Sequence, residues 1–110
     1  MSNKPIKCLA DICIFPLSEG YKGLSKYVAI FQKVFDRNGL KYVLHSNGTN
    51  VEGKMDTVLK AVQECHEVCH SMGIPRMHSE IRLGTRIDKE PTLEDKIKSV
   101  KNRLKNDLLK

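Results

Sequence analysis

The chain of 110 residues contains no tryptophan, few aromatic residues and no long hydrophobic run. Its longest uncharged apolar stretch, Ile12 to Leu17, has six residues, whereas a transmembrane helix needs about 20. The first residues also lack the apolar run and the small-residue cleavage site that characterise a secretory signal. These absences argue against a membrane-spanning protein and predict a soluble, cytoplasmic one.

Length and composition predict one domain that spans residues 1–110. Hydrophobic residues make up 40% of the chain. A chain of this size buries roughly 60–70% of its unfolded surface, which is enough for a core without disulfides. No repeat, low-complexity tract or linker divides the sequence. We therefore expect a single packed unit.

The net charge is +6. Half of this positive excess lies in residues 89–110, which contain seven Lys or Arg residues and four Asp or Glu residues. A basic terminal helix can bind phosphates or acidic partners, although it is more often a solvated face. Only 5% of the residues are aromatic, so nucleic-acid bases would find few stacking partners. A nucleic-acid partner is therefore not expected.

The cysteines are four in number: Cys8, Cys13, Cys65 and Cys69. Without an export signal, disulfides are not expected, and Cys8 and Cys13 should point to opposite faces of an apolar strand. The run Cys65 to His70 has two Cys and two His at helical spacing. Neighbours on one helix cannot surround a metal as a tetrahedron. We expect packed thiols, no metal and no cofactor.

Apolar periodicity and turn residues predict four strands and three helices. The strands are expected at 7–15, 40–46, 49–52 and 76–88, with a tight turn at Asn47-Gly48 between the second and the third. The first helix, capped by Ser25 and ended by Asn38-Gly39, follows the first strand, and the second helix, at 55–71 with a buried stripe that includes Leu59 and Met72, follows the third strand. The final helix begins at Thr92 and carries apolar residues on one side: Leu93, Ile97, Val100, Leu104 and Leu108.

This order predicts an α+β fold, a ferredoxin-like βαββαβ sandwich with an extra C-terminal helix. The two long helices should cover one face of a four-stranded antiparallel sheet. Residues 76–88 alternate without a break, so the other face should display Arg76, His78, Glu80, Arg82 and Arg86. An open, partly apolar face and a long edge strand both favour self-association. We therefore expect a homodimer or homotetramer.

Two groups of residues could bind a small ligand. Residues 46–53 combine small hydroxyls, glycines and one carboxylate in a tight turn, where the backbone can approach a ligand and Glu52 could hold a cationic or amidine-like group. A plain hairpin with Glu52 at a helix N-terminus explains the same residues equally well. At the end of the last strand, Arg82 and Arg86 point the same way and could share an anion, or they could be exposed arginines that pair with carboxylates such as Asp11 or Glu80.

Several segments of this sequence resemble one family: Leu9–Leu17, Leu44–Gly53 with its GTxxEG pattern, His66-Glu67, Ile81–Lys89 with its TRxDK pattern, and Thr92–Lys96. The chain resembles, over about residues 7–104, the small thiamine-binding-protein-like family, whose fungal members are linked to cell-wall biogenesis.

The resemblance implies a ferredoxin-like fold that assembles into dimers and tetramers. It also implies a non-enzymatic role in binding a small molecule, with thiamine or its pyrimidine moiety as the best-known ligand. Carried over by motif, the ligand-binding positions are Ser46, Gly48, Thr49, Glu52, Arg82, Arg86, Asp88 and Lys89. A chain of charge +6 suits a phosphorylated thiamine, or sulfate or phosphate, better than the thiamine cation. Phe15 and Tyr42 are the aromatic residues best placed along the sequence to contact a pyrimidine.

Two other functions occur on this topology. An acylphosphatase-like enzyme needs a glycine-flanked loop with an arginine after the first strand, and residues 16–23 contain glycines but no arginine. An RNA-binding module needs aromatic residues on the two central strands, and here the first strand offers only Phe15. Both remain alternatives to a binding protein for a small metabolite.

Overall fold

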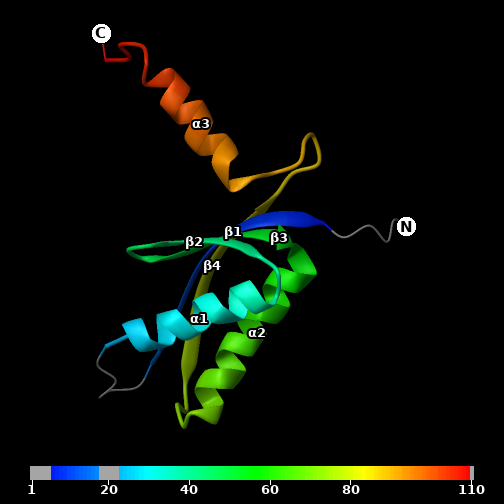
Figure 1. The fold of residues 1–110 in the computed structure, drawn as a ribbon, viewed down its shortest axis with the longest axis vertical. Coiled ribbons are helices and arrows are strands. Elements are labelled where there is room, and N and C mark those ends of the chain that lie inside the picture. The colour runs from blue at the N-terminus through cyan, green and yellow to red at the C-terminus, as the bar shows by residue number, and fades with distance from the viewer. Residues whose placement is uncertain (1–5, 18–22, 110) are drawn as a thin grey trace.

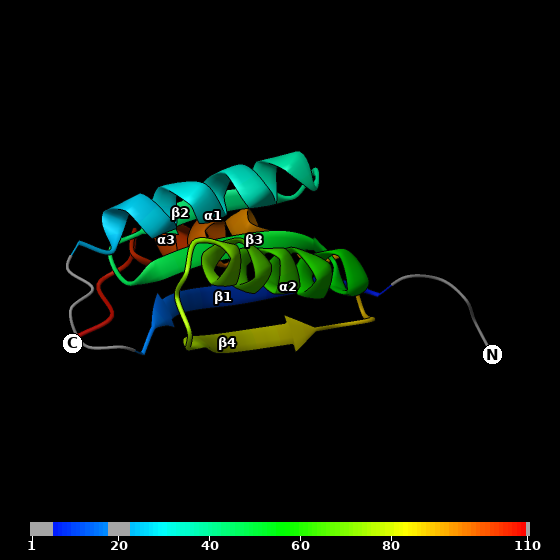
Figure 2. The same ribbon diagram turned by 90° about the horizontal axis from the view of Figure 1, so that it is seen from below.

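Four strands form one antiparallel sheet in the order β2-β3-β1-β4. The computed structural model describes residues 6–17 and 23–109. Its elements are β1 (Lys7–Pro16), α1 (Ser25–Arg37), β2 (Lys41–His45), β3 (Gly48–Lys54), α2 (Met55–Ser71), β4 (Met77–Thr85) and α3 (Leu93–Arg103). The long helices α1 and α2 lie on the same side of the sheet (Figures 1 and 2). The prediction of a ferredoxin-like α+β fold with an added C-terminal helix is confirmed.

The core lies between the sheet and the α1–α2 pair. Alternation along β1 sends Cys8, Ala10, Ile12 and Ile14 into this layer, where each is at most 6% exposed. They meet the buried stripes of the two helices and the middle of β3, which contribute Phe31, Val34, Phe35, Val51, Val58, Ala61, Val62, Cys65 and Cys69. The predicted buried stripe of α2 was wrong at two positions, because Leu59 and Met72 are exposed, and it left out Ala61, which packs in the core.

Three local predictions were wrong in detail. Ser25 lies inside α1, and Leu24 holds the N-cap position without a side-chain hydrogen bond. The two residues of the β2–β3 turn are Ser46 and Asn47, because His45 pairs with Gly48. The last strand ends at Thr85 and not at residue 88 as predicted. Thr85 pairs with Cys8, and because β1 begins one residue earlier, at Lys7, the residues after Thr85 have almost no partner strand.

The second face of the sheet is the one that α1 and α2 do not cover, and we call it the open face. Register places Leu9, Asp11, Cys13 and Phe15 of β1 on it, opposite Gly84, Arg82, Glu80 and His78 of β4. Tyr42 pairs with Val51 on the other side and contacts Phe35, with 6.3 Å between ring centroids. Only Phe15 of the two aromatic candidates therefore reaches the open face. None of the described helices is both long and apolar enough to span a membrane.

Candidate functional site

The predicted site residues fall into two separate hollows. Ser46, Gly48 and Thr49 line the first, of about 480 Å³, which lies between the β2–β3 turn, β1 and α1. We call it the hairpin hollow. Arg82 and Arg86 line the second, of about 650 Å³, which lies between the open face and the start of α3. We call this one the open-face hollow. The structure therefore does not bring the two predicted groups into one site.

Apolar side chains line much of the hairpin hollow, among them the core residues Ile12, Phe31 and Phe35. Its buried hydroxyl belongs to Thr49, which accepts a hydrogen bond of 2.9 Å from Gln32 Nε2. At Gly48 an added Cβ would lie 2.8 Å from the backbone oxygen of Ile12. The glycine and the threonine thus serve the close packing of this turn against β1 and α1.

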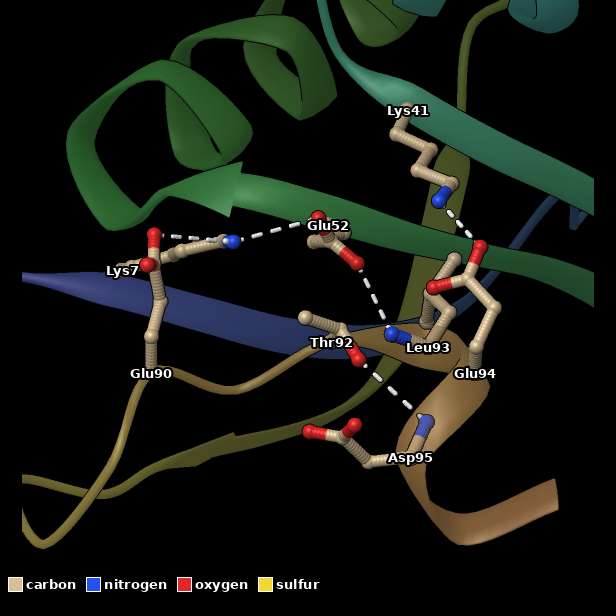
Figure 3. Close-up of polar contacts among 8 residues, drawn as sticks. All are labelled: Lys7, Lys41, Glu52, Glu90, Thr92, Leu93, Glu94 and Asp95. Carbon is tan, nitrogen blue, oxygen red and sulfur yellow. Dashed lines mark hydrogen bonds and ion pairs between the residues drawn. The ribbon is translucent and has the colours of Figure 1, made fainter. Parts of the chain in front are cut away.

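Glu52 anchors α3. Its Oε1 accepts a hydrogen bond of 2.8 Å from the backbone N–H of Leu93, and its Oε2 lies 3.2 Å from Lys7 Nζ (Figure 3). The side chain is only 11% exposed. A carboxylate is favourable at a helix N-terminus, where backbone N–H groups have no partner within the helix. The sequence suggested this role for Glu52 at the helix that directly follows it; the structure gives it to the helix that starts 41 residues later.

Two further contacts fix the first turn of α3. The Thr92 hydroxyl accepts a hydrogen bond of 3.2 Å from Asp95 N, which confirms the predicted cap. Glu94 pairs with Lys41 of β2 (Figure 3). Because Glu52 and Lys41 belong to the sheet, these contacts place the side chains of this turn at the rim of the open face. Leu93, Lys96 and Ile97 thereby become a wall of the open-face hollow.

The floor of the open-face hollow carries a row of polar side chains across three strands. Register sets Asp11 of β1 between Asn50 of β3 and Arg82 of β4. Asp11 Oδ1 lies 2.7 Å from His45 Nε2 of β2, so the imidazole fixes the carboxylate from the far side. Leu9 and Gly84 complete the floor, and no atom lies within 4 Å of where a Cβ of Gly84 would be. This glycine keeps the hollow open.

Three cations face this hollow: Arg82, Arg86 and Lys96. Arg86 Nε donates a hydrogen bond of 2.6 Å to Asp88 Oδ1, and this contact lowers the pKa of the Asp88 carboxyl to about 2. Asp88 therefore neutralises Arg86 in part. Within residues 6–17 and 23–109, no carboxylate lies in ion-pair range of Arg82 or Lys96. Their charge is available to an anion.

Lys89 and Asp88 lie in the segment between β4 and α3 and do not line the hollow. Asp88 acts on it only through Arg86. The sequence singled out neither Asn50 nor Lys96 as a ligand-binding residue, although Asn50 lies within the candidate segment 46–53, and it indicated Asp11 only as a partner for the arginines. The available signal was Asp11, the one charged residue of the apolar strand after Lys7 at its start. A carboxylate in such a strand is costly to bury unless it faces a polar surface.

The Cys65–His70 run packs against the sheet. Cys65 and Cys69 are fully buried, and burial raises the pKa of the Cys65 thiol to about 12. His66 Nε2 contacts the Ser79 hydroxyl, and His70 Nδ1 lies 2.8 Å from the carbonyl oxygen of Ile74. Across the described part of the chain, no three His, Cys, Asp or Glu side chains are grouped as a metal ion requires. All four thiols are free.

Known proteins resemble this chain over nearly its whole length. It is 44% identical over 103 residues to the UPF0045 protein sll0230 of Synechocystis, covering 94% of this chain and 84% of the relative. It is 41% identical over 96 residues to the UPF0045 protein ECM15 of the fungus Eremothecium gossypii, covering 87% and 91%.

Solved structures of other proteins also resemble this chain. A protein of Methanocaldococcus jannaschii, MJ1052, superposes with a TM-score of 0.78 at 36% identity, covering 86% of this chain and 96% of that one. A Thermotoga maritima protein, named as a candidate thiamine biosynthesis/salvage protein, superposes with a TM-score of 0.70 at 19% identity, covering 86% and 98%. The family model described as "Thiamine-binding protein" matches residues 10–101. The chain therefore belongs to the thiamine-binding protein family, UPF0045.

Proposed function

We propose that this protein binds, without catalysis of its own, a small nitrogen heterocycle that carries a phosphate or similar anionic group. Thiamine monophosphate is the probe of this chemistry that the family membership suggests. The observation that carries the proposal is the open-face hollow, of about 650 Å³, where Arg82 and Lys96, which have no ion-pair partner among the described residues, lie with the fixed Asp11 carboxylate around the apolar side chain of Leu9. A hollow of this volume is in the range of small-molecule sites.

The anionic group would lie between Arg82 and Lys96. A guanidinium presents a planar fork of donors that matches phosphate oxygens, and a lysine adds a point charge. Asp88 holds the Arg86 guanidinium at the edge of the same hollow. Charge-assisted hydrogen bonds of this kind are the strongest polar contacts that a small ligand can make. The thiamine cation without a phosphate would meet repulsion here.

The ring would lie over Leu9, with its edge toward Asp11 and Asn50. The carboxylate accepts hydrogen bonds only, and the amide can both donate and accept. Together they match an aminopyrimidine edge, which offers amino N–H donors beside a ring-nitrogen acceptor. His45 fixes Asp11 from the far side, so this edge is held in place before the ligand arrives, and preorganisation of this kind raises affinity. Leu93 and Ile97 supply an apolar wall.

The absence of catalysis is part of the proposal. The hydroxyls among the hollow's lining residues belong to Thr85 and Thr92, and the Thr92 hydroxyl already caps α3. The acylphosphatase-like alternative depends on residues 16–23, of which 18–22 lie outside the described residues. The RNA-binding alternative finds only Phe15 as an aromatic on the open-face side of the central strands β1 and β3. Neither alternative gains a specific observation.

Self-association and a cytoplasmic location belong to the same proposal. β4 lies at an edge of the sheet, where its outer backbone groups have no partner strand among the described residues. The outer edge of β4 could therefore pair with a strand of a second copy, which would extend the sheet. The link to cell-wall biogenesis that the family resemblance implies stays a prediction.

Calorimetric titration of the full chain tests the proposal, with thiamine monophosphate, thiamine and inorganic phosphate as ligands. We expect thiamine monophosphate to bind most tightly. Arg82→Gln should weaken it by about 10- to 100-fold, the cost of one lost charge-assisted hydrogen bond. Asp11→Asn should weaken thiamine monophosphate and leave phosphate unchanged, because that carboxylate faces the ring. Arg76→Gln, which precedes β4 and does not line the hollow, is the matched control.

Equal binding of phosphate and thiamine monophosphate would reduce the hollow to an anion site. Tighter binding of unphosphorylated thiamine, or no effect of Arg82→Gln, would contradict the proposal.

A further inference from the structure

His45, the last residue of β2, makes two hydrogen bonds that determine which of its ring nitrogens carries the proton. Its Nδ1 accepts the backbone N–H of Asn47 at 3.2 Å, and its Nε2 lies 2.7 Å from Asp11 Oδ1. A ring nitrogen that accepts an N–H uses its lone pair for that bond and carries no proton. The proton of the neutral ring therefore lies on Nε2, which donates it to the Asp11 carboxylate.

The charged form of His45 fits only one of these two partners. In an imidazolium both ring nitrogens are donors, so an Nδ1–H would face the N–H of Asn47. The β2–β3 turn, which contains Asn47, thus favours the neutral Nε2–H ring. Asp11 is the ion-pair partner of His45 among the described residues, and it receives a hydrogen bond from a neutral donor that leaves its negative charge in place.

Gly48 makes room for this pair. It lies opposite His45 where the hairpin closes, and an added Cβ would lie 3.3 Å from both Asp11 Oδ1 and His45 Cε1. The glycine that lets the turn approach β1 thus also lets the imidazole reach Asp11. His45 lines the hairpin hollow, whereas Asp11 lines the open-face hollow. The hairpin therefore acts on the open-face hollow through His45.

The two carboxylate oxygens of Asp11 have different surroundings. His45 holds Oδ1, and no donor in residues 6–17 or 23–109 lies within hydrogen-bond distance of Oδ2. The side chain is 40% exposed and lines the hollow beside Asn50. An ionised carboxylate only accepts hydrogen bonds. With one oxygen fixed and the other free, Asp11 can hold a ring only through a donor on that ring.

We propose that His45 is a positioning residue of the ligand site: as the Nε2–H tautomer it fixes Asp11 as a charged acceptor, and Asp11 then selects rings with an amino group over rings with an oxo group in the same place. An amino group donates to the free oxygen, whereas an oxo group would set its lone pairs against the carboxylate. This inference rests on the proposed function, because the selected ring belongs to the proposed ligand.

Calorimetric titration of the full chain with thiamine monophosphate and oxythiamine monophosphate tests the selection, since an oxo group replaces the pyrimidine amino group in the second ligand. Wild type should prefer the amino form by about 10- to 100-fold, the value of one hydrogen bond to a charged group. His45→Leu should lower this ratio by about 10-fold, because the freed carboxylate can turn towards Arg82, its neighbour in the register.

Two further variants separate positioning from a purely structural role, which would change both affinities together and leave their ratio unchanged. His45→Gln, whose amide N–H can replace Nε2–H as the donor to Asp11, should keep most of the preference. His78→Leu is the matched control, because this histidine lies on the same sheet face and lines neither hollow. It should keep the full preference.

Nitrogen-15 NMR of the imidazole rings at neutral pH tests the positioning without ligand, so the two proposals can fail separately. His45 should show a protonated Nε2 and an unprotonated Nδ1, and His45→Leu, but not His78→Leu, should shift the Asp11 carboxyl carbon. A charged or Nδ1–H ring, or an unchanged amino-over-oxo ratio in His45→Leu, would overturn this inference and leave the ligand site standing. A wild type that binds neither ligand would refute the proposed function, and the selection with it.

Discussion

Arg86 and Asp88 form an ion pair just beyond β4, and this pair decides how much charge the open-face hollow presents. The Arg86 guanidinium lowers the pKa of the Asp88 carboxyl to about 2. Asp88 is therefore ionised throughout the physiological pH range, and its negative charge partly neutralises Arg86 at the edge of the hollow. The effective cations are Arg82, which projects from the sheet, and Lys96, which projects from α3.

The first prediction concerns this pair. Arg86→Gln should raise the pKa of Asp88 from about 2 toward its ordinary value of 3.8, as measured by carboxyl carbon NMR titration. A carboxyl with a lowered pKa adds stability above its unfolded-state pKa, and that stability is lost as the pH falls through the folded-state pKa. The wild type should therefore lose slightly more stability than the variant between about pH 4 and pH 2. Arg82→Gln is the control and should leave the Asp88 titration unchanged. An unshifted Asp88 in Arg86→Gln would refute the pairing.

The thiols give a second prediction. Burial raises the pKa of Cys8, Cys65 and Cys69, that of Cys65 to about 12, so these thiols are protonated and enclosed. The pKa of Cys13 is raised by partial burial and by the charges of Glu80 and Asp11, but this side chain remains partly accessible. Under native conditions at neutral pH, one thiol should react slowly with a maleimide, and Cys13→Ser should remove that reaction. All four should react in denaturant. Fast labelling of a second thiol would contradict the packed core.

At the scale of secondary-structure elements, the root of α3 depends on one side chain of β3. Glu52 accepts the Leu93 N–H and pairs with Lys7 while almost buried. Glu90 also contacts Lys7, at 3.3 Å, but is 75% exposed. Glu52 and Glu90 can therefore be compared directly, because both contact Lys7 but only Glu52 lies at the N-terminus of α3.

A third prediction follows from this contrast. Glu52→Ala should lower the free energy of unfolding by about 1.5–3 kcal/mol, the range for hydrogen bonds to a charged group. Glu90→Ala should cost less than about 1 kcal/mol, as exposed ion pairs do. Urea denaturation measures both, and hydrogen exchange at the amides of residues 93–95 should accelerate only in Glu52→Ala. Equal effects of the two variants would show that Glu52 does not anchor α3.

The β2–β3 turn carries the fourth prediction. At Gly48 an added Cβ would meet the backbone oxygen of Ile12 at 2.8 Å, and a backbone atom cannot yield as a side chain can. Gly48→Ala should therefore cost about 1–3 kcal/mol, the range for overpacking. Gly84→Ala, with no atom within 4 Å of the new Cβ, should be close to neutral. Urea denaturation compares them, and equal stabilities would contradict the close approach of this turn to β1.

The sequence predicted the elements well and their long-range contacts poorly. Alternation in β4 and the i, i+3, i+4 pattern of α2 are local signals, so the fold class and the limits of α2 followed from them. The partner of Glu52 did not, because Leu93 is 41 residues away and no local pattern links a strand carboxylate to a later helix. The split of the site has the same cause: Thr49 and Glu52 lie in one motif, yet Thr49 faces the core and Glu52 the open face. Alternation along β3 could have separated them.

On the scale of the whole molecule, two apolar surfaces lie uncovered, the side of α3 that carries Ile97 and the half of the open face around Phe15. The extended shape, with a radius of gyration of 16.5 Å, reflects α3, which points away from an otherwise two-layered fold (Figure 1). The polar half of the open face, with Asp11, Asn50 and Arg82, lies beside the first turn of α3. The proposed ligand site and the uncovered apolar half thus occupy neighbouring but distinct parts of the same sheet face.

The most direct test of the central claim is an NMR titration of the labelled full chain with thiamine monophosphate, because it distinguishes the two hollows. Saturable shifts should concentrate at the amides of Asp11, Asn50, Arg82 and Lys96, around the open-face hollow. The amides of residues 46–49, at the hairpin hollow, should move little. Shifts centred on residues 46–49, or no saturable shift at all, would contradict the open-face hollow as the binding site.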